Sequence, residues 1–111
     1  GGVFGLGPTG QNLAGALAGE TFEINEMYPV YLNAAEFQGE AQARLSFHYA
    51  LSAEKIHAAM YMAAKKAVDG GKDYQIGPIH ICDKCGYTGE GRVPDRCPVC
   101  SATKERFRSF E

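Results

Sequence analysis

The chain has 111 residues, a formal net charge of −2 and a hydrophobic fraction of 45%, which is the composition of an ordinary small soluble protein. This length allows one modest domain, or a helical unit followed by a miniature domain that a metal holds together. The balanced charge excludes a basic surface for nucleic acid, and no apolar stretch reaches the roughly 20 residues of a membrane span. The first residues also lack the pattern of a signal peptide, so we expect a cytoplasmic protein with neither a nucleic-acid nor a membrane partner.

A glycine-rich loop and one bent helix are predicted for the first third of the chain. Residues 1–10 contain five glycines and a proline, which cannot sustain a helix. From about Gln11 to Glu36, apolar residues recur in steps of three, four or seven, as on one face of a helix. Pro29 interrupts this segment and removes one internal hydrogen bond. The apolar stripe resumes beyond Pro29, which predicts one bent helix rather than two.

A second helix is predicted after a short turn at Gly39. Apolar residues repeat with the same spacing from Ala43 to Val68, and Gly70 and Gly71 end the pattern. The apolar stripe of this helix omits two positions, which Glu54 and His57 occupy. Ionisable side chains therefore occupy places where a helical bundle would ordinarily carry Leu or Ile, and burying them without a partner of opposite charge would be costly.

These ionisable residues form a candidate metal site. Residues three apart on a helix share a face, so Glu54 and His57 could bind one metal, and Glu20 and Glu23 could do the same from the first helix. A Glu-x-x-His pair alone is weak evidence, because such pairs are common on solvated helix faces. Its position on an apolar stripe, opposite a second acidic pair, favours a site with two irons. Tyr28 is a core residue on this evidence, or a hydroxyl that bonds to a metal ligand.

The C-terminal part carries all four cysteines in two Cys-x-x-Cys pairs. Each pair can wrap a tight turn around one metal, so Cys82, Cys85, Cys97 and Cys100 predict a tetrahedral four-thiolate site. The segments Cys85-Gly-Tyr and Cys97-Pro-Val-Cys100 resemble the two cysteine turns of rubredoxin, which holds one iron. The alternative interpretation, a zinc ribbon whose metal only stabilises the fold, remains open at this point.

The predicted fold class is mainly α with a small metal-bound β and loop domain. A ferritin-like di-iron bundle uses a Glu from each of two helices and a Glu-x-x-His from each of the other two, and this chain supplies half of that set. Another copy, a second polypeptide or a further segment should supply the other two helices. The expected divisions are a loop at 1–10, a helical hairpin at 11–71, a linker at 72–78 and a rubredoxin-like domain at 79–111.

In these motifs the chain resembles the C-terminal part of rubrerythrin, a family of non-haem di-iron peroxidases with a rubredoxin-like tail. The similar segments are Ala18 to Pro29, Ala53 to Ala58 and Cys82 to Phe110, and the glycine-rich start corresponds to the family's long crossover. The resemblance implies that Glu20 and Glu54 bind or bridge iron and that His57 is an imidazole ligand. It further implies that Glu23 is a ligand released on reduction and that Tyr28 is a phenol beside the ligands.

The resemblance also implies an activity and partners. The expected reaction is reduction of hydrogen peroxide to water at the di-iron site. Electrons would come through the iron of the four-cysteine site from rubredoxin or an NAD(P)H-linked reductase. In the family the rubredoxin-type iron of one subunit lies near the di-iron site of its partner, which implies a homodimer or pairing with a second chain. Two alternatives stay open, namely an electron-transfer or interaction module with only the four-cysteine metal bound, and a ferroxidase or iron-storage protein.

Overall fold

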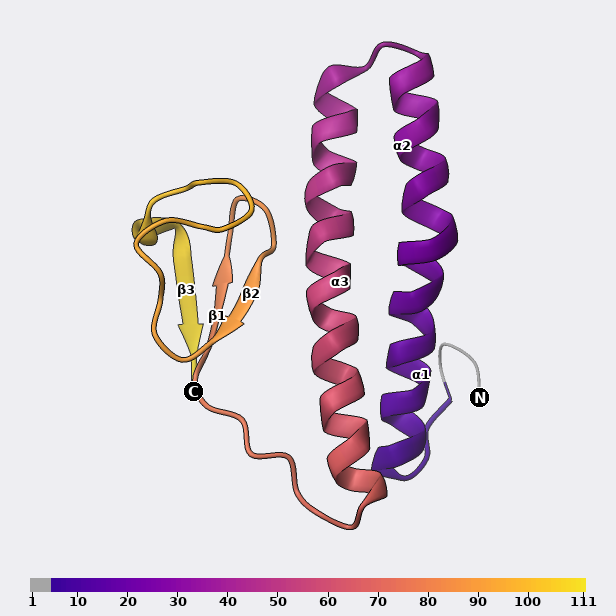
Figure 1. The fold of residues 1–111 in the computed structure, drawn as a ribbon, viewed down its shortest axis with the longest axis vertical. Helices are drawn as coiled ribbons and strands as arrows, with labels where there is room; N and C mark the ends of the chain where they lie inside the picture. Colours follow the sequence, from indigo (N-terminus) through magenta and orange to yellow (C-terminus); the bar gives the residue numbers. More distant parts are fainter. Residues whose placement is uncertain (1–4) are drawn as a thin grey trace.

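The computed structural model describes residues 5–111 and consists of a long helical hairpin and a small three-stranded domain (Figure 1). The first arm of the hairpin contains α1 (Thr9–Phe22), the π-helical turn η1 (Glu23–Met27) and α2 (Tyr28–Phe37). The second arm is the single helix α3 (Ala41–Asp69). A helical hairpin followed by a small sheet domain confirms the predicted fold class. The first four residues of the predicted glycine-rich loop lie outside the described part.

The first arm begins two residues earlier than predicted, and its irregularity is a π turn rather than a kink at the proline. Pro8 precedes the helix with φ of −58°, and its carbonyl accepts the first helical hydrogen bond, from Asn12 at 3.0 Å. The predicted bend at Pro29 is instead a π turn in the five residues from Glu23 to Met27. The backbone N–H of Tyr28 donates to the carbonyl of Glu23, five positions back. Because Pro29 has no N–H, the ordinary hydrogen-bond ladder is broken there, and a wider turn accommodates the break.

The two arms are joined by a compact turn. Gly39 has φ of +69°, a conformation that suits glycine. The N–H of Gly39 donates to the carbonyl of Glu36 at 3.1 Å, and the N–H of Glu40 donates to that of Ala35 at 2.9 Å. This pair of bonds forms a Schellman motif, which satisfies the last carbonyls of the first arm. The same pattern ends α3 at Gly71, which explains why both predicted helix ends coincide with glycines.

The small domain is built on a three-stranded antiparallel sheet. Strand β1 (Ile79–Cys82) lies in the centre, between β2 (Thr88–Glu90) and β3 (Phe107–Phe110). A 3-10 turn, η2 (Lys104–Arg106), precedes β3. The sheet is too small to enclose an apolar core, and its buried side chains are mainly the cysteines. A metal that joins the cysteines would therefore supply the cross-links that the core lacks.

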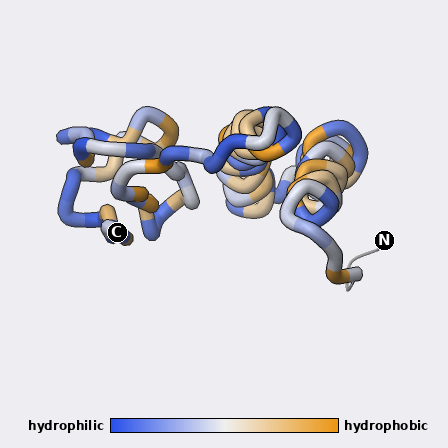
Figure 2. Tube along the Cα trace, turned by 90° about the horizontal axis from the view of Figure 1, so that it is seen from below, coloured by the Kyte–Doolittle hydropathy of each residue, from blue (hydrophilic) through white to orange (hydrophobic). Residues whose placement is uncertain are grey.

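The small domain folds back along α3, so α3 lies between it and the first arm of the hairpin (Figures 1 and 2). Residues 72–78 have no regular secondary structure and can span at most about 25 Å. His57 lies twelve positions before Asp69, which is about 18 Å along a helix. The segment is thus long enough to bring the domain alongside the middle of α3. Within the described residues, no helix combines the length and the apolar character that crossing a membrane requires.

Candidate metal centres

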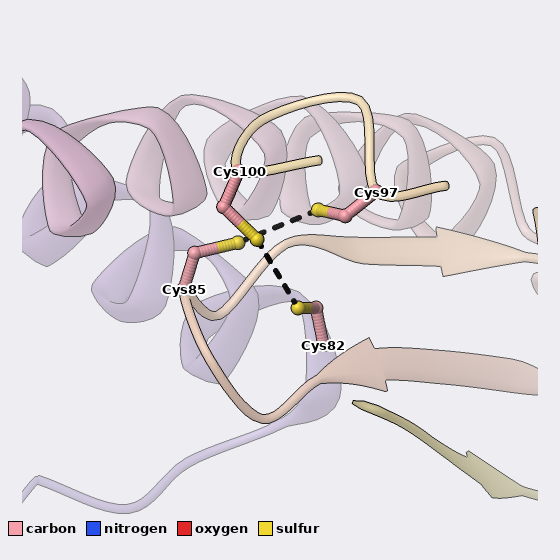
Figure 3. A group of neighbouring side chains, drawn as sticks. All are labelled: Cys82, Cys85, Cys97 and Cys100. Carbon is pink, nitrogen blue, oxygen red and sulfur yellow. Dashed lines mark hydrogen bonds between the residues drawn. The ribbon is translucent and has the colours of Figure 1, made fainter. Parts of the chain in front are cut away.

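The four cysteines converge on one point in the small domain (Figure 3). Their sulfur atoms all lie within 4.8 Å of one another. The Sγ atoms of Cys82 and Cys100 are 3.7 Å apart, and those of Cys85 and Cys97 are 3.5 Å apart. A tetrahedral metal with metal–sulfur bonds of about 2.3 Å has sulfur–sulfur separations of about 3.8 Å. The cluster therefore has nearly the size of a four-thiolate metal site.

The two cysteine turns are held by matching backbone hydrogen bonds. In the first turn the N–H of Gly86 donates to the carbonyl of Cys82 at 2.8 Å. In the second turn the N–H of Ser101 donates to the carbonyl of Cys97 at 2.9 Å. Gly86 and Ser101 both have positive φ, of 87° and 62°, so each cysteine turn ends in the same left-handed conformation. The sequence does not predict this conformation at Ser101, because a serine stands there at the position that glycine occupies in the first turn.

Burial and backbone hydrogen bonds shift the pKa values of Cys85 and Cys97 in opposite directions. Burial raises the pKa of Cys85 well above its ordinary value, although the N–H of Tyr87 donates to its sulfur and opposes the rise. Burial also acts to raise the pKa of Cys97, but the backbone N–H groups of Cys100 and Val99 outweigh it and lower that pKa. Amide donors aimed at sulfur stabilise thiolate, the form that binds metal. The cysteine sulfurs are therefore shielded from water, while backbone N–H groups stabilise negative charge on them.

The second candidate centre lies between the two arms of the hairpin. Glu20 of α1 and Glu54 and His57 of α3 place one ligand atom each within 4.8 Å of one another. The Nδ1 atom of His57 is 3.5 Å from Oε2 of Glu54 and 3.8 Å from Oε1 of Glu20. Both distances exceed a normal hydrogen bond but are close to the separation of about 3.4 Å between two ligands bound tetrahedrally to one metal at about 2.1 Å.

Glu20 supplies the observation that tests whether a cation fits this centre. Its Oε2 atom is buried and has no hydrogen-bond partner among the described residues. A buried carboxylate oxygen without a partner is costly, so such groups are normally paired with a donor or a cation. Carboxylate and imidazole are also the donor set that suits iron. The three residues present therefore fit a metal ligand set.

Two further predicted site residues lie outside this cluster of three. Glu23 begins the π turn and, with Glu20, lines an open hollow of about 1060 Å³ along the first arm. Tyr28 follows the π turn, and its ring packs 6.1 Å from Tyr31 and 6.3 Å from Phe47, measured between ring centroids. The structure thus brings together three of the four predicted helix ligands. Glu23 is on the same side as Glu20 but is not part of the group.

The hollow beside Glu20 and Glu23 lies along an unusually small-residue surface of the first arm. Its helical lining consists of glycine and alanine with a few polar side chains, namely Gln11, Asn12, Ala14, Gly15, Ala16, Ala18, Gly19, Glu20 and Glu23. Few residues of the hairpin are buried, and several large apolar side chains are half or more exposed, including Phe22, Val30 and Met62. A surface of this kind allows another helix to approach closely, and it lies beside Glu20 and Glu23.

A contact that the sequence did not predict joins the two centres. The Nε2 atom of His57 is 2.9 Å from the hydroxyl of Thr88, the first residue of β2. Thr88 is 7% exposed and follows Cys85 by three positions. Tyr49, one of the residues packed against the cysteine cluster, lies on the same face of α3 as His57. No spacing rule links Thr88 to a residue 31 positions away, so only the folded structure reveals the pair.

Comparison with known protein families matches both halves of the chain. Residues 6–65 match the family model described as Rubrerythrin, and residues 80–108 match that of the rubrerythrin rubredoxin-like domain. The first match covers more than half of the chain. This chain belongs to the rubrerythrin family. The resemblance noted from the sequence motifs is confirmed, and the four-cysteine unit is a rubredoxin-like domain.

Individual rubrerythrins show the same relationship. Rubrerythrin-2 of Clostridium acetobutylicum is 44% identical over 110 residues, which cover 99% of this chain and 60% of that protein. Nigerythrin of Nitratidesulfovibrio vulgaris is 33% identical over 99 residues, which cover 89% of this chain and 48% of that protein. A solved structure of nigerythrin in a partially reduced state superimposes with a TM-score of 0.83 at 30% identity, over 99% of this chain and 54% of that one. The chain thus spans about half the length of the relatives it matches.

Proposed function

We propose that this rubrerythrin family member is the catalytic and electron-relaying part of a non-haem di-iron peroxidase. Glu20, Glu54 and His57 would be iron ligands, and Glu23 would be a further ligand that joins them in one oxidation state. Bound there as two ferrous ions, iron would supply the two electrons with which hydrogen peroxide, taking up two protons, becomes two molecules of water. The observation that carries the proposal is the convergence of two carboxylates and an imidazole, in which the carboxylate of Glu20 has a buried oxygen without a hydrogen-bond partner among the described residues.

The rubredoxin-like domain would return electrons to that centre. A four-thiolate iron changes its charge by one unit without a change of ligands, so it suits one-electron transfer. His57 contacts the domain through Thr88, so an imidazole of the helix site touches the domain that carries the four cysteines. We propose rubredoxin or an NAD(P)H-linked reductase as the external electron donor. A partner subunit's domain near these helices, as the resemblance implies, stays a prediction, since in this chain the domain lies against its own α3.

Two further helices are needed to complete the proposed di-iron site. The three clustered residues are about half of the ligands that a ferritin-like di-iron centre uses. The small-residue surface of α1 beside Glu20 and Glu23 has room for a neighbouring helix. We propose that a second hairpin packs there and contributes the remaining Glu and Glu-x-x-His. It could be another segment of a longer chain, a second polypeptide or a second copy in a homodimer.

The iron content and the native mass of one purified sample test this assembly together. About three irons per chain, with added mass, would mean that a separate hairpin completes each bundle. About two irons per chain in a dimer would mean that two copies build one shared di-iron site. About one iron per chain would leave only the thiolate-bound metal and would contradict the peroxidase proposal for this chain.

A pair of variants then tests the relay. Cys82→Ser should abolish steady-state peroxide reduction with the electron donor, because the four-thiolate site is lost. After chemical reduction, the same variant should still react once with peroxide at the helix site. His57→Ala should lose both reactions, since the helix site itself is damaged. Equal loss of both reactions in Cys82→Ser would contradict the relay.

One observation favours a second candidate, an electron-transfer module in which only the four-cysteine metal is bound. The four-cysteine site is complete within this chain, whereas the helix site supplies three clustered ligands. In that case the helices would serve to pair with another chain. Visible absorption would show the thiolate-to-iron bands of the rubredoxin-like site alone, with no added contribution from a di-iron centre.

A further inference from the structure

The hydroxyl of Thr88 has two partners, and their chemistry decides the direction of both hydrogen bonds. It lies 3.1 Å from the backbone carbonyl of Gly86 and 2.9 Å from Nε2 of His57. A carbonyl oxygen can only accept, so the single hydroxyl proton of Thr88 is donated to Gly86. The oxygen of Thr88 must then accept the bond with His57. The Nε2 atom of His57 therefore carries a hydrogen.

The tautomer of His57 follows from this direction. A neutral imidazole carries one N–H, so a hydrogen on Nε2 leaves Nδ1 with a free electron pair. Nδ1 is the ring atom that faces the carboxylates of Glu54 and Glu20, at 3.5 and 3.8 Å. Only the unprotonated nitrogen of a histidine can bind a metal. The bond to Thr88 thus presents the nitrogen that faces the carboxylates in the form that a metal needs.

We propose that Thr88 is a positioning residue that selects the Nε2–H tautomer of His57 and fixes the orientation of its ring. This inference rests on the proposed function in one respect, that His57 is a metal ligand at the helix site. A histidine ligand commonly donates its other N–H to a partner that sets its tautomer and raises its basicity. Here that partner belongs to the rubredoxin-like domain. Metal affinity at the helix site consequently depends on how that domain is docked.

The docking contact is close enough to hold Thr88 in place. Tyr49, Ala53 and His57 are spaced by four residues and so share one face of α3. Tyr49 packs against the cysteine cluster, and Ala53 is only 5% exposed. A Cβ atom on Gly86 would lie 3.4 Å from the Cβ of Ala53. The backbone that carries the Gly86 carbonyl is thus in contact with α3, four residues before His57.

The test uses two substitutions of Thr88, one that removes the hydroxyl and one that keeps it. Thr88→Val has nearly the same shape but cannot accept a hydrogen bond, and Thr88→Ser keeps the hydroxyl. Thr103→Val is the matched control, because Thr103 is an exposed threonine of the same domain. Cobalt bound to the four cysteines, followed by its thiolate charge-transfer absorption, reports in every variant whether the domain is folded.

The first readout is the tautomer of His57 in protein without metal at the helix site. It is measured by ¹⁵N NMR of histidine-labelled protein, at a pH where the ring is neutral. We expect the Nε2–H form in the wild type, in Thr88→Ser and in Thr103→Val, and a mixture of the two tautomers in Thr88→Val. An Nδ1–H ring in the wild type would overturn the proposal. An unchanged tautomer in a folded Thr88→Val protein would overturn it equally.

The second readout is the affinity of the helix site for Fe²⁺, titrated anaerobically in protein whose four-cysteine site is already filled. We expect Thr88→Val to weaken this affinity about 10- to 100-fold, with Thr88→Ser close to the wild type. Equal affinities in Thr88→Val and the wild type would overturn the positioning role. Peroxide turnover is not part of either readout. Failure of the peroxidase proposal can therefore be told apart from failure of this one.

Discussion

Gly86 and Ala53 meet with no side chain between them, because a Cβ atom on Gly86 would lie only 3.4 Å from the Cβ of Ala53. This contact joins the first cysteine turn to the middle of α3. It brings the rubredoxin-like domain within reach of His57. The stability of the docked arrangement therefore depends on the small size of both residues.

Enlarging Ala53 should separate the rubredoxin-like domain from α3. Ala53 is 5% exposed, and overpacking a buried position typically costs about 1–3 kcal/mol. We expect Ala53→Leu to lower the free energy of unfolding by that amount or to undock the domain. Undocking would speed proteolytic cleavage within residues 72–78. The control is Ala63→Leu at an exposed position of α3, and equal cleavage rates in the two variants would contradict the docking contact.

Replacing Glu20 should have opposite effects on metal binding and on stability. The Oε2 atom of Glu20 is buried and has no hydrogen-bond partner within residues 5–111, so the metal-free protein bears its desolvation cost. We expect Glu20→Gln to raise the free energy of unfolding of the metal-free protein by about 1 kcal/mol while removing iron from the helix site. Chemical denaturation and iron analysis measure the two effects. Glu26→Gln, at an exposed position of the π turn, should change neither, and a loss of metal-free stability in Glu20→Gln would argue against an unpaired carboxylate.

Metal binding at the four cysteines should release protons and strengthen as the pH rises. Burial raises the pKa of Cys85 well above its ordinary value, so the metal-free protein keeps that thiol protonated through the neutral range. A bound metal displaces this proton, and apparent affinity therefore falls as the pH falls. Zinc titrations by calorimetry in buffers of different ionisation enthalpy count the protons released. Affinity that does not change between pH 6 and 8 would contradict the raised pKa.

Glycine at position 101 should stabilise the second cysteine turn. Ser101 has φ of 62°, a left-handed conformation that costs a non-glycine residue about 1–2 kcal/mol. Glycine adopts it freely but loses more entropy on folding, by about 0.5–1 kcal/mol. We expect Ser101→Gly to stabilise the metal-bound protein by up to about 1 kcal/mol, measured as a higher midpoint of thermal unfolding. Ser109→Gly in strand β3 should instead destabilise it, and parallel shifts in both variants would contradict the conformational explanation.

Helix ends and ligand motifs could be predicted from the sequence because both depend on local spacing. Gly39 and Gly71 end helices by the same local hydrogen-bond pattern, and each Cys-x-x-Cys pair forms its own turn. The hydrogen bond between His57 and Thr88 could not be predicted, since it depends on how a linker folds back. Pro29 signalled a break in the first helix, but a missing N–H does not determine whether the chain kinks or widens into a π turn.

The π turn also fixes the rotational phase of the first arm. A π turn holds one residue more than the α-helical turn it replaces, so it offsets the segment on one side from the other by about 100° around the helix axis. Tyr31 contacts Phe47 beyond the turn, and Glu20 faces His57 before it. Deleting one residue between Glu23 and Met27 would restore α-helical winding and rotate Glu20 away from α3. A deletion of one residue in this stretch would thus be enough to move the carboxylate of Glu20 away from Glu54 and His57.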